Sequence, residues 1–516
     1  MKKQLLYLSI LLLSCSTTLW SAPNAVFSKI TKSYVLHNDG SQEMRVLKEV
    51  TLNTYRAFRS MYGESFITYN PDYQKLVVNE SYTRQKDGNV VKTPANAFVE
   101  CLPSIAADAP AYNGLKEMVV VHTGLELGAT IYLDYTITTK AGYYPELDVC
   151  EEVPELSPIK NYTLSISVPS GKPFHYTIIN GNEQPQTVTE NGYKKVTWDL
   201  VNVPARPAEN GLSIASGDIK AIFANTYSSL STALDNLQKQ FSNGSEAEVK
   251  TLAQSLTAGK TTDSEKLEAI RSYVNTLSYC RVPLALNGYR FRTASEVIST
   301  NYATLAEKVN LTAALMQCVS LPVQVKVSYP VKVSEEYLGL NAIDNIFIDN
   351  STIADMSTFY PVYTLKGEKV TIQAHNNTVN ETDTINVTAE SGQAVNGNYR
   401  MVTLPNLQSI HDLYGAYAVN TTRSSNLLLP FTTDETDTYL INLPANATFC
   451  SPTRPYSISN AVGKMTVSYD TSDGHLIMKR ALRIDKQLIK ASEYPEFYKL
   501  MTEWKDAKYT SLFVKL

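Results

Sequence analysis

The sequence predicts a multidomain α+β protein: an antiparallel β-sandwich, then a mixed α+β domain, then a β-rich domain with a late helix. Three observations lead to this prediction. Apolar and polar residues alternate through much of residues 26–221, the apolar spacing becomes helical near residue 222, and alternation returns from about residue 366. Alternation with a period of two indicates a strand with one packed face, and a period near 3.6 indicates a helix.

These changes of pattern set the expected organisation of the 516-residue chain. The apolar fraction of 43% is high enough for packed cores. We predict a leader over residues 1–22, a β-sandwich domain over 23–222, an α+β domain over 223–365 and a β-rich domain over 366–516.

The first residues have the pattern of a secretory signal. Lys2 and Lys3 precede a short apolar run that ends at Leu13. The residues before Cys15 resemble a bacterial lipobox, in which that cysteine is lipidated, and ordinary cleavage near Ala22 is the alternative. Both readings predict export, to the periplasm or the outer membrane. No later apolar run is long enough for a transmembrane helix.

Composition and charge exclude some functions. The formal net charge is −4, which argues against a nucleic-acid-binding protein, because such a protein needs a concentrated basic face. Only 19% of the residues are charged, whereas 33 are Tyr, which suits an exported β-rich protein. We therefore expect no nucleic-acid partner.

The cysteines and histidines give no sign of a metal or cofactor site. No CxxC is present, and no His/Cys spacing matches a zinc site. Cys101 and Cys150 flank one strand-rich stretch, and two readings remain open for them: a disulfide in an oxidising compartment, or two small buried side chains. We expect no cofactor and no metal.

In the N-terminal region, the strands are bounded by residues that favour tight turns. Asp39-Gly40, Asp87-Gly88, Asn180-Gly181 and Asn191-Gly192 supply the positive φ angles that hairpins need. Alternation is clearest in the sets ending at Ile137, Val168 and Leu200. These features predict hairpins with one face packed against a second layer.

The central region carries four candidate helix starts. Each has Ser or Thr followed three residues later by Glu, the pattern of a capping box: Ser245/Glu248, Thr262/Glu265, Thr293/Glu296 and Thr304/Glu307. The last opens a helix that is apolar on most sides and is expected to be buried. Strands are predicted at 323–327, 345–348 and 352–354.

The C-terminal region returns to alternation. Ser472-Asp473-Gly474 is a candidate hairpin tip, a helix is expected from Tyr494 to Asp506, and a last strand from Ser511 to Lys515.

The central domain resembles the transglutaminase-like fold, a papain-related architecture with a Cys-His-Asp site. The resemblance rests on Ile270–Val274, Gly288-Tyr289, Arg292–Val297 and the helix from Leu311 to Met316. The flanking regions resemble the domains of unknown function found beside transglutaminase-like domains in Gram-negative envelope proteins. The resemblance implies an exported protein with a cleft that holds an extended ligand.

The resemblance also identifies the expected catalytic positions, and most have lost their chemistry. The position of the nucleophilic cysteine falls on Leu305, which cannot ionise. The position of the His falls on Asn345, beside Asp344, and no His occurs from residue 176 to 374. Only the Asp is retained, as Asp355. We therefore assign no catalytic residue.

Three hypotheses follow. The first is a non-catalytic envelope protein, or pseudoenzyme, that binds or scaffolds a peptide, glycan or protein partner. The second is an enzyme that acts on amide bonds through a rebuilt site, with Asp344, Asp355 and Cys280 as candidate residues. The third is a structural module whose cleft is filled by its own side chains.

Overall fold

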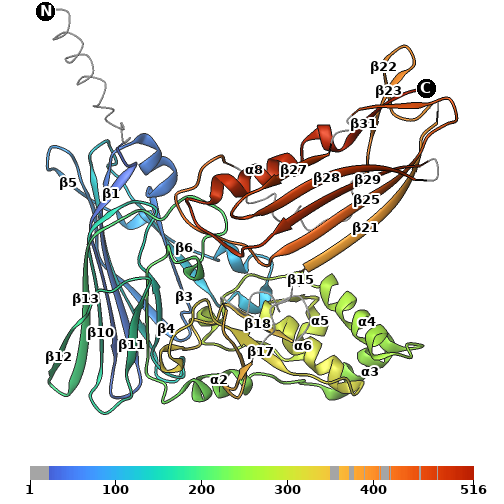
Figure 1. Ribbon diagram of the computed structural model, residues 1–516. Coiled ribbons are helices and arrows are strands. Elements are labelled where there is room, and N and C mark those ends of the chain that lie inside the picture. Colours follow the sequence, from blue (N-terminus) through green and yellow to red (C-terminus); the bar gives the residue numbers. More distant parts are fainter. Residues whose placement is uncertain are drawn as a thin grey trace, which may run out of the picture.

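The computed structural model describes residues 22–348, 360–370, 377–388, 390–405, 407, 418, 420–451, 455–472 and 475–516. The chain is strand-rich and multidomain, in agreement with the α+β class (Figure 1). The leader with Cys15 and the retained Asp355 lie outside the described residues. So do the predicted strand at 352–354 and the tip at Asp473-Gly474.

A large eight-stranded sheet dominates the N-terminal region. Its order is β12 (Gln186–Glu190), β13 (Tyr193–Val203), β10 (Ile159–Pro169), β1 (Ala25–Leu36), β2 (Gln42–Leu52), β8 (Thr130–Thr139), β4 (Gln74–Arg84) and β5 (Val90–Lys92). The expectation of a purely antiparallel sheet is wrong at one place, because β1 and β10 run parallel. No local sequence pattern indicates this parallel pairing, because more than a hundred residues separate the two strands in the chain.

Two small sheets supply the layer that packs on this large sheet. One contains β11 (His175–Ile179), β14 (Ala221–Asn225) and β9 (Asp148–Glu152), and the other contains β3 (Glu64–Tyr69), β7 (Lys116–Val121) and β6 (Phe98–Cys101). Apolar side chains of β9 and β14 share a core with β1, β10 and β13, and those of β3 and β7 pack on β8. β14 crosses the predicted boundary at residue 222.

The expected tight turns form at three of the four Asp-Gly and Asn-Gly sites. Gly40 joins β1 to β2 with φ 85°, Gly88 joins β4 to β5 with φ 92°, and Asn191-Gly192 joins β12 to β13. Asn180 also has a positive φ of 53°, but the hairpin expected there is wrong. The strands on either side of it pair elsewhere, β11 with β14 and β12 with β13.

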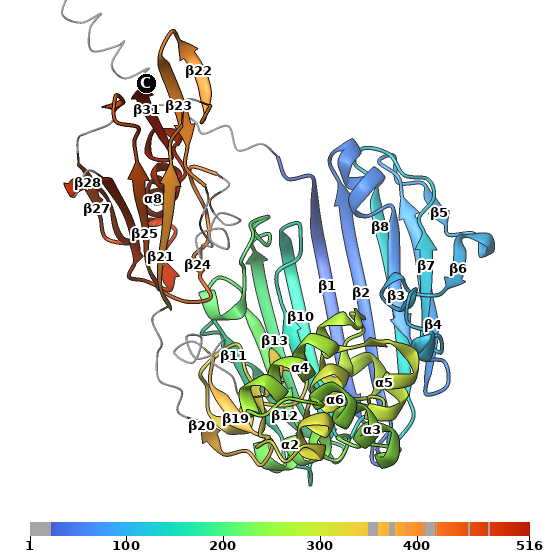
Figure 2. The same ribbon diagram turned by 90° about the vertical axis from the view of Figure 1, so that its right-hand side faces the viewer.

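The central region consists of helices followed by a four-stranded sheet (Figure 2). The helices are α2 (Leu230–Gln238), α3 (Glu246–Thr257), α4 (Asp263–Thr276), α5 (Ala294–Thr300) and α6 (Leu305–Cys318). A short parallel pair, β15 (Ser278–Tyr279) and β16 (Tyr302–Ala303), lies beside them. The sheet order is β18 (Asn345–Ile348), β17 (Val325–Ser328), β19 (Val362–Thr364) and β20 (Lys369–Val370).

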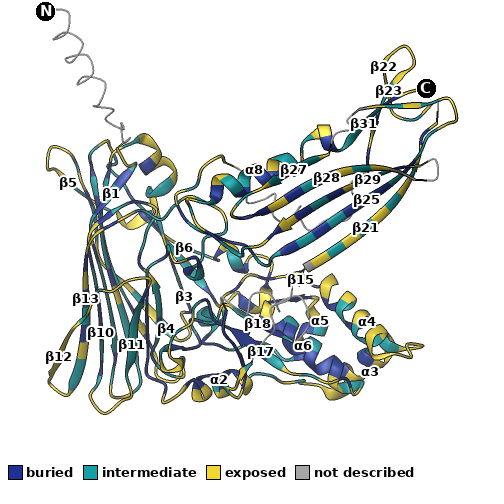
Figure 3. Ribbon diagram, in the orientation of Figure 1, coloured by how far each residue is buried: buried dark blue, intermediate teal, exposed yellow. Residues whose placement is uncertain are grey.

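The predicted helix starts are confirmed. Complete capping boxes open α4, α5 and α6, and at α3 the Ser245 side chain accepts from the backbone N–H of Glu248. α6 is buried on most sides, whereas α4 carries an exposed face (Figure 3). α6 is therefore the helix around which this region packs.

The C-terminal region packs one helix on a five-stranded sheet. The sheet order is β21 (Asn377–Asn386), β25 (Thr433–Asn442), β29 (His475–Ile484), β28 (Gly463–Ser472) and β27 (Tyr456–Ser459). A second sheet contains β22 (Gln393–Asn396), β23 (Tyr399–Thr403), β31 (Ser511–Lys515) and β26 (Thr448–Ser451), and β24 (Leu427–Leu428) pairs with β30 (Leu488–Ile489). The late helix is α8 (Tyr494–Trp504), and β31 has the predicted bounds.

Two further expectations concern cysteines and membrane spans. Cys101 and Cys150 are both free, so the disulfide considered for them does not form; they lie in different sheets, on β6 and β9. Within the described residues, no helix is long and apolar enough to cross a bilayer.

Candidate functional site

The site is built around the first turn of α6. Thr304 is the N-cap: its side chain accepts from the backbone N–H of Glu307, whose carboxylate accepts the backbone N–H of Thr304 at 2.8 Å. Leu305 is therefore the first residue of the helix, the place where a helix dipole best supports a negative charge. Leu305 is 39% exposed. The fold thus presents this position to the outside but fills it with a group that cannot ionise.

A cavity of about 260 Å³ opens at Leu305 and brings together residues that are distant in the chain. Its lining includes Cys280, Leu305, Asp344 and Asn345. Four of the five positions identified from the sequence therefore meet in one place, and the fifth, Asp355, lies outside the described residues. No histidine lines the cavity within the part of the chain that the structure describes.

Cys280 is held between strand and helix in a poorly reactive setting. Its backbone N–H donates to the carbonyl of Ala303 at 2.9 Å, which extends the pairing of β15 with β16. The side chain is buried, and burial raises the pKa of the thiol. A thiol with a raised pKa has less of the nucleophilic thiolate at neutral pH.

Asp344 lines the same cavity as Cys280 but makes no hydrogen bond with it. Burial raises the pKa of its carboxyl group. Its backbone N–H donates to the carbonyl of Ser328, which fixes the entry to β18. No hydrogen bond between Asp344 and Cys280 is formed, so the described residues contain no assembled pair of nucleophile and base at this site.

Beneath Leu305, Glu307 forms a buried charged network that the sequence pattern did not reveal. Arg292 donates to both of its carboxylate oxygens, at 2.7 and 3.0 Å, and the Tyr112 hydroxyl donates at 2.7 Å. Burial alone would raise the pKa of Glu307, but the bonds from Arg292, Thr304 and Tyr112 hold it below its ordinary value. Glu307 was expected only as a helix cap, because Tyr112 lies 195 residues away.

A loop of the N-terminal region forms a further wall of the site. Ile105, Asp108 and Ala109 face Tyr279 and Cys280 across a second cavity of about 410 Å³. Ala106, Ala109, Tyr112 and Leu115 pack in one core with Cys280 and Tyr302. No local sequence signal marks this loop, which joins the site only through tertiary packing.

A Ser–His contact elsewhere in the N-terminal region lacks the properties of a catalytic pair. Ser65 lies on β3 and His122 directly follows the neighbouring strand β7, with the Ser65 hydroxyl and His122 Nε2 2.9 Å apart. Burial lowers the pKa of His122 to about 4, and its Nδ1 has no hydrogen-bond partner. A histidine this weakly basic, with no carboxylate to orient it, is a poor general base.

Comparisons with known proteins give the family of the chain. Residues 38–207 match the domain of unknown function DUF3857, and residues 399–514 match DUF3858; both are described as domains with a solved structure. No curated protein matches the chain significantly. A solved structure from Parabacteroides distasonis ATCC 8503, described as a "putative protease", is 37% identical with a TM-score of 0.87. The match covers 96% of this chain and 99% of that chain.

The chain therefore belongs to the same family as the Parabacteroides protein, with DUF3857 and DUF3858 domains flanking the central region. An M1 zinc metallopeptidase from Deinococcus radiodurans is 12% identical, with a TM-score of 0.21 over 39% of this chain and 42% of that chain. That similarity is too low to indicate a shared fold. Both domain matches lie outside the central region, so its transglutaminase-like character stays a prediction.

Proposed function

We propose that this protein is a non-catalytic binding protein of the cell envelope, whose central cavity holds part of an extended peptide. The observation that carries the proposal is Leu305, which is 39% exposed at the head of α6, where the resemblance places a nucleophile. The signal-like leader is the basis for a location outside the cytoplasm. Exposure of Leu305 argues against a cleft filled by its own side chains.

The walls of the cavity suit a peptide backbone. Among the described strands, β18 is an outer strand of the sheet, and its first residues, Asn345 and Ile346, line the cavity. An outer strand offers backbone N–H and C=O groups with which an extended peptide can pair. Leu305 and Tyr279, which is 57% exposed, offer apolar surface for its side chains.

Replacing Leu305 by Glu is expected to weaken peptide binding about tenfold or more, because it removes an apolar contact worth about 1.5–3 kcal/mol. Peptides would be selected from a phage-displayed library of random linear sequences, and their affinities measured by calorimetry. Val201→Glu is the matched control, because Val201 is an exposed apolar residue on β13, remote from the cavity lining. Failure to select any peptide, or equal binding by both variants, would contradict the proposal.

A second candidate function is hydrolysis or transfer at an amide bond through Cys280. Cys280 and Asp344 line one cavity. The solved relative from Parabacteroides distasonis is described as a "putative protease". In such a reaction the thiolate would attack the amide carbonyl, and the C–N bond would break as the leaving amine takes up a proton from solvent. Water or a second amine would then release the acyl group from the sulfur and restore the thiol. The raised pKa of Cys280 opposes the first of these requirements.

Thiol labelling distinguishes the two functions. We expect iodoacetamide at neutral pH to modify the exposed Cys450 fully while the buried Cys280 stays largely unmodified, with both sites read by mass spectrometry. Equally fast labelling of Cys280, together with a peptidase activity that Cys280→Ala abolishes, would favour the enzyme.

A further inference from the structure

Another cavity in the central region lies further along α6 than the cavity at Leu305. Its volume is about 350 Å³, within the range of about 300–1,000 Å³ typical of small-molecule sites. Asn310, Ala313, Ala314 and Gln317 form the helical wall, spaced so that they lie on one side of the helix. The opposite walls come from the end of α2, the start of β17 and the turn between β19 and β20.

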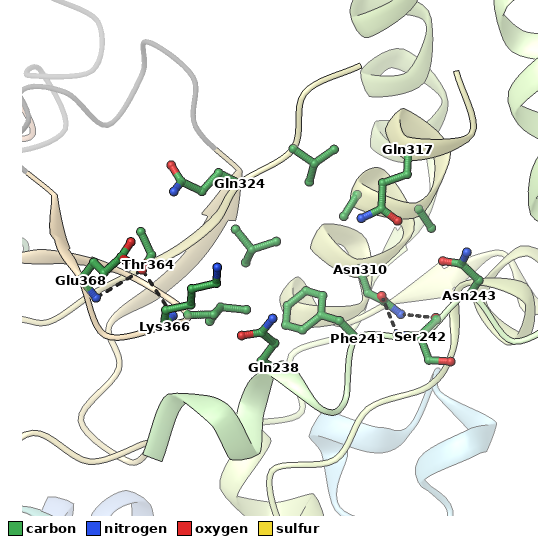
Figure 4. A pocket seen from close by; sticks show the side chains of 15 residues that line it. Gln238, Phe241, Ser242, Asn243, Asn310, Gln317, Gln324, Thr364, Lys366 and Glu368 are labelled. Carbon is green, nitrogen blue, oxygen red and sulfur yellow. Dashed lines mark hydrogen bonds between the residues drawn. The ribbon is translucent and has the colours of Figure 1, made fainter. Parts of the chain in front are cut away.

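The side chains around this cavity are unusually rich in carboxamides. Figure 4 shows Phe241 among the labelled residues, with Gln324 on one side and Gln317 and Asn243 on the other. Gln238 completes the set. Within the described part of the chain, the side-chain amides of Gln238, Asn243, Gln317 and Gln324 make no hydrogen bond. Their donors and acceptors are therefore available to a ligand.

A fifth amide has a structural role and holds the cavity in shape. Asn310 is buried, and its side chain donates to the carbonyl of Ser242 at 3.0 Å and accepts from the Ser242 backbone N–H at 3.2 Å. This pair of bonds fixes the segment that carries Phe241 and Asn243. Phe241 is further held edge-to-face against Phe291, with ring centroids 5.1 Å apart. The aromatic ring is thus positioned before any ligand arrives.

The lining has no excess of positive or negative charge, which suits a neutral ligand. Lys366 and Glu368 are the charged residues of the lining, and they oppose each other in sign. A phosphate or a polyanion would need several cations, and a purely apolar ligand would leave the amides without partners. A carboxamide offers two N–H donors and one acceptor oxygen. It can therefore donate hydrogen bonds to hydroxyl groups and also accept hydrogen bonds from them.

We propose that this cavity binds a neutral saccharide. The amides of Asn243, Gln317 and Gln324 would bond its hydroxyl groups, while the C–H face of a sugar ring would pack on Phe241. Ala313 and Ala314 leave room for the ring beside α6, because both are small and buried. The inference is independent of the peptide cleft, since it concerns a different cavity and a different ligand.

The test is ligand-observed NMR on the full chain with maltose, cellobiose and N,N′-diacetylchitobiose as probes. We expect saturation transfer to at least one sugar. Loss of one or two amide bonds in Gln317→Ala and Gln324→Ala should weaken its binding about fivefold to tenfold. Gln254→Ala is the matched control, because Gln254 is an exposed helical Gln of α3 outside the lining, and it should leave the affinity unchanged.

The Phe241→Leu variant tests whether the aromatic ring contributes to sugar binding, while the fold of the region is kept. Leu keeps apolar contact with Phe291 but removes the aromatic face, so binding should weaken while the melting temperature stays near that of the wild type. The proposal is overturned if none of the three sugars binds, or if the sugar that binds does so equally well to Gln317→Ala, Gln324→Ala and Phe241→Leu. Failure of the peptide experiment has no bearing on this result.

Discussion

Replacing Glu307 by Ala is expected to destabilise the central region by about 3–5 kcal/mol, because it leaves a buried charge without its partner. The Glu307 side chain has no exposed surface, and Arg292 donates to both of its oxygens. The substitution strands this guanidinium against the ring of Tyr302, 4.4 Å away. It also removes the acceptor of the Tyr112 hydroxyl, which ties the N-terminal loop to the head of α6.

The chain contains a matched control for this substitution. Glu296 occupies the same position in the capping box of α5 but is exposed, so Glu296→Ala should cost only about 1 kcal/mol. Hydrogen exchange of amides in α6 and α5, followed as a function of urea, measures both free energies. Similar losses in the two variants would show that the buried ion pair contributes nothing beyond the cap.

Asp148 is expected to make stability fall as the pH rises from about 4 to about 7. It lies on β9 and accepts the backbone N–H of Asn341 at 3.0 Å, which joins the N-terminal region to the loop before β18. Gly339 permits this approach, because a Cβ there would lie 2.4 Å from Asp148 Oδ1. Burial raises the pKa of Asp148 from 3.8 to about 7, although hydrogen bonds from Asn341 and Leu340 oppose the rise.

The sign follows from the protons bound in each state. Between these two pKa values the folded chain holds a proton on Asp148 that the unfolded chain has released, so raising the pH favours unfolding. The contribution is fully present below pH 4 and is lost above pH 7. A rise from 3.8 to about 7 corresponds to about 4 kcal/mol. Since this half-buried side chain also lines a cavity that water can enter, we expect about 2–4 kcal/mol.

Glu43 and Glu146 line the same cavity as Asp148. Glu146 is bonded to Lys172 and to the Thr226 hydroxyl, and burial raises the pKa values of the nearby Tyr227 and Tyr289. Asp148→Asn should therefore remove most of the loss of stability between pH 4 and pH 7, measured by urea unfolding at each pH. Glu190→Gln, an exposed carboxyl on β12, should leave the loss unchanged. A pH dependence that persists in Asp148→Asn would refute this assignment.

The parts of the fold that the sequence predicted are those with local signals. The capping boxes at Thr262, Thr293 and Thr304 place three helix starts correctly, because each is a hydrogen-bond pattern completed within four residues. The hairpins at Gly40 and Gly88 likewise depend on the φ angle of one residue. Asn180 shows the limit of this reasoning: its φ is positive, but strand pairing elsewhere decides that no hairpin forms.

The features of the candidate site are likewise of two kinds, those set by local sequence and those set by tertiary contacts. The sequence by itself determined that a residue without ionisable chemistry, Leu305, opens the core helix, because the helix start and the residue type are both local. Only the tertiary structure decided that Cys280 and Asp344 meet at that residue and that Glu307 pairs with Arg292 and Tyr112. These contacts join segments far apart in the chain. The free energy that selects them comes from burying many side chains together, and no short stretch of sequence records it.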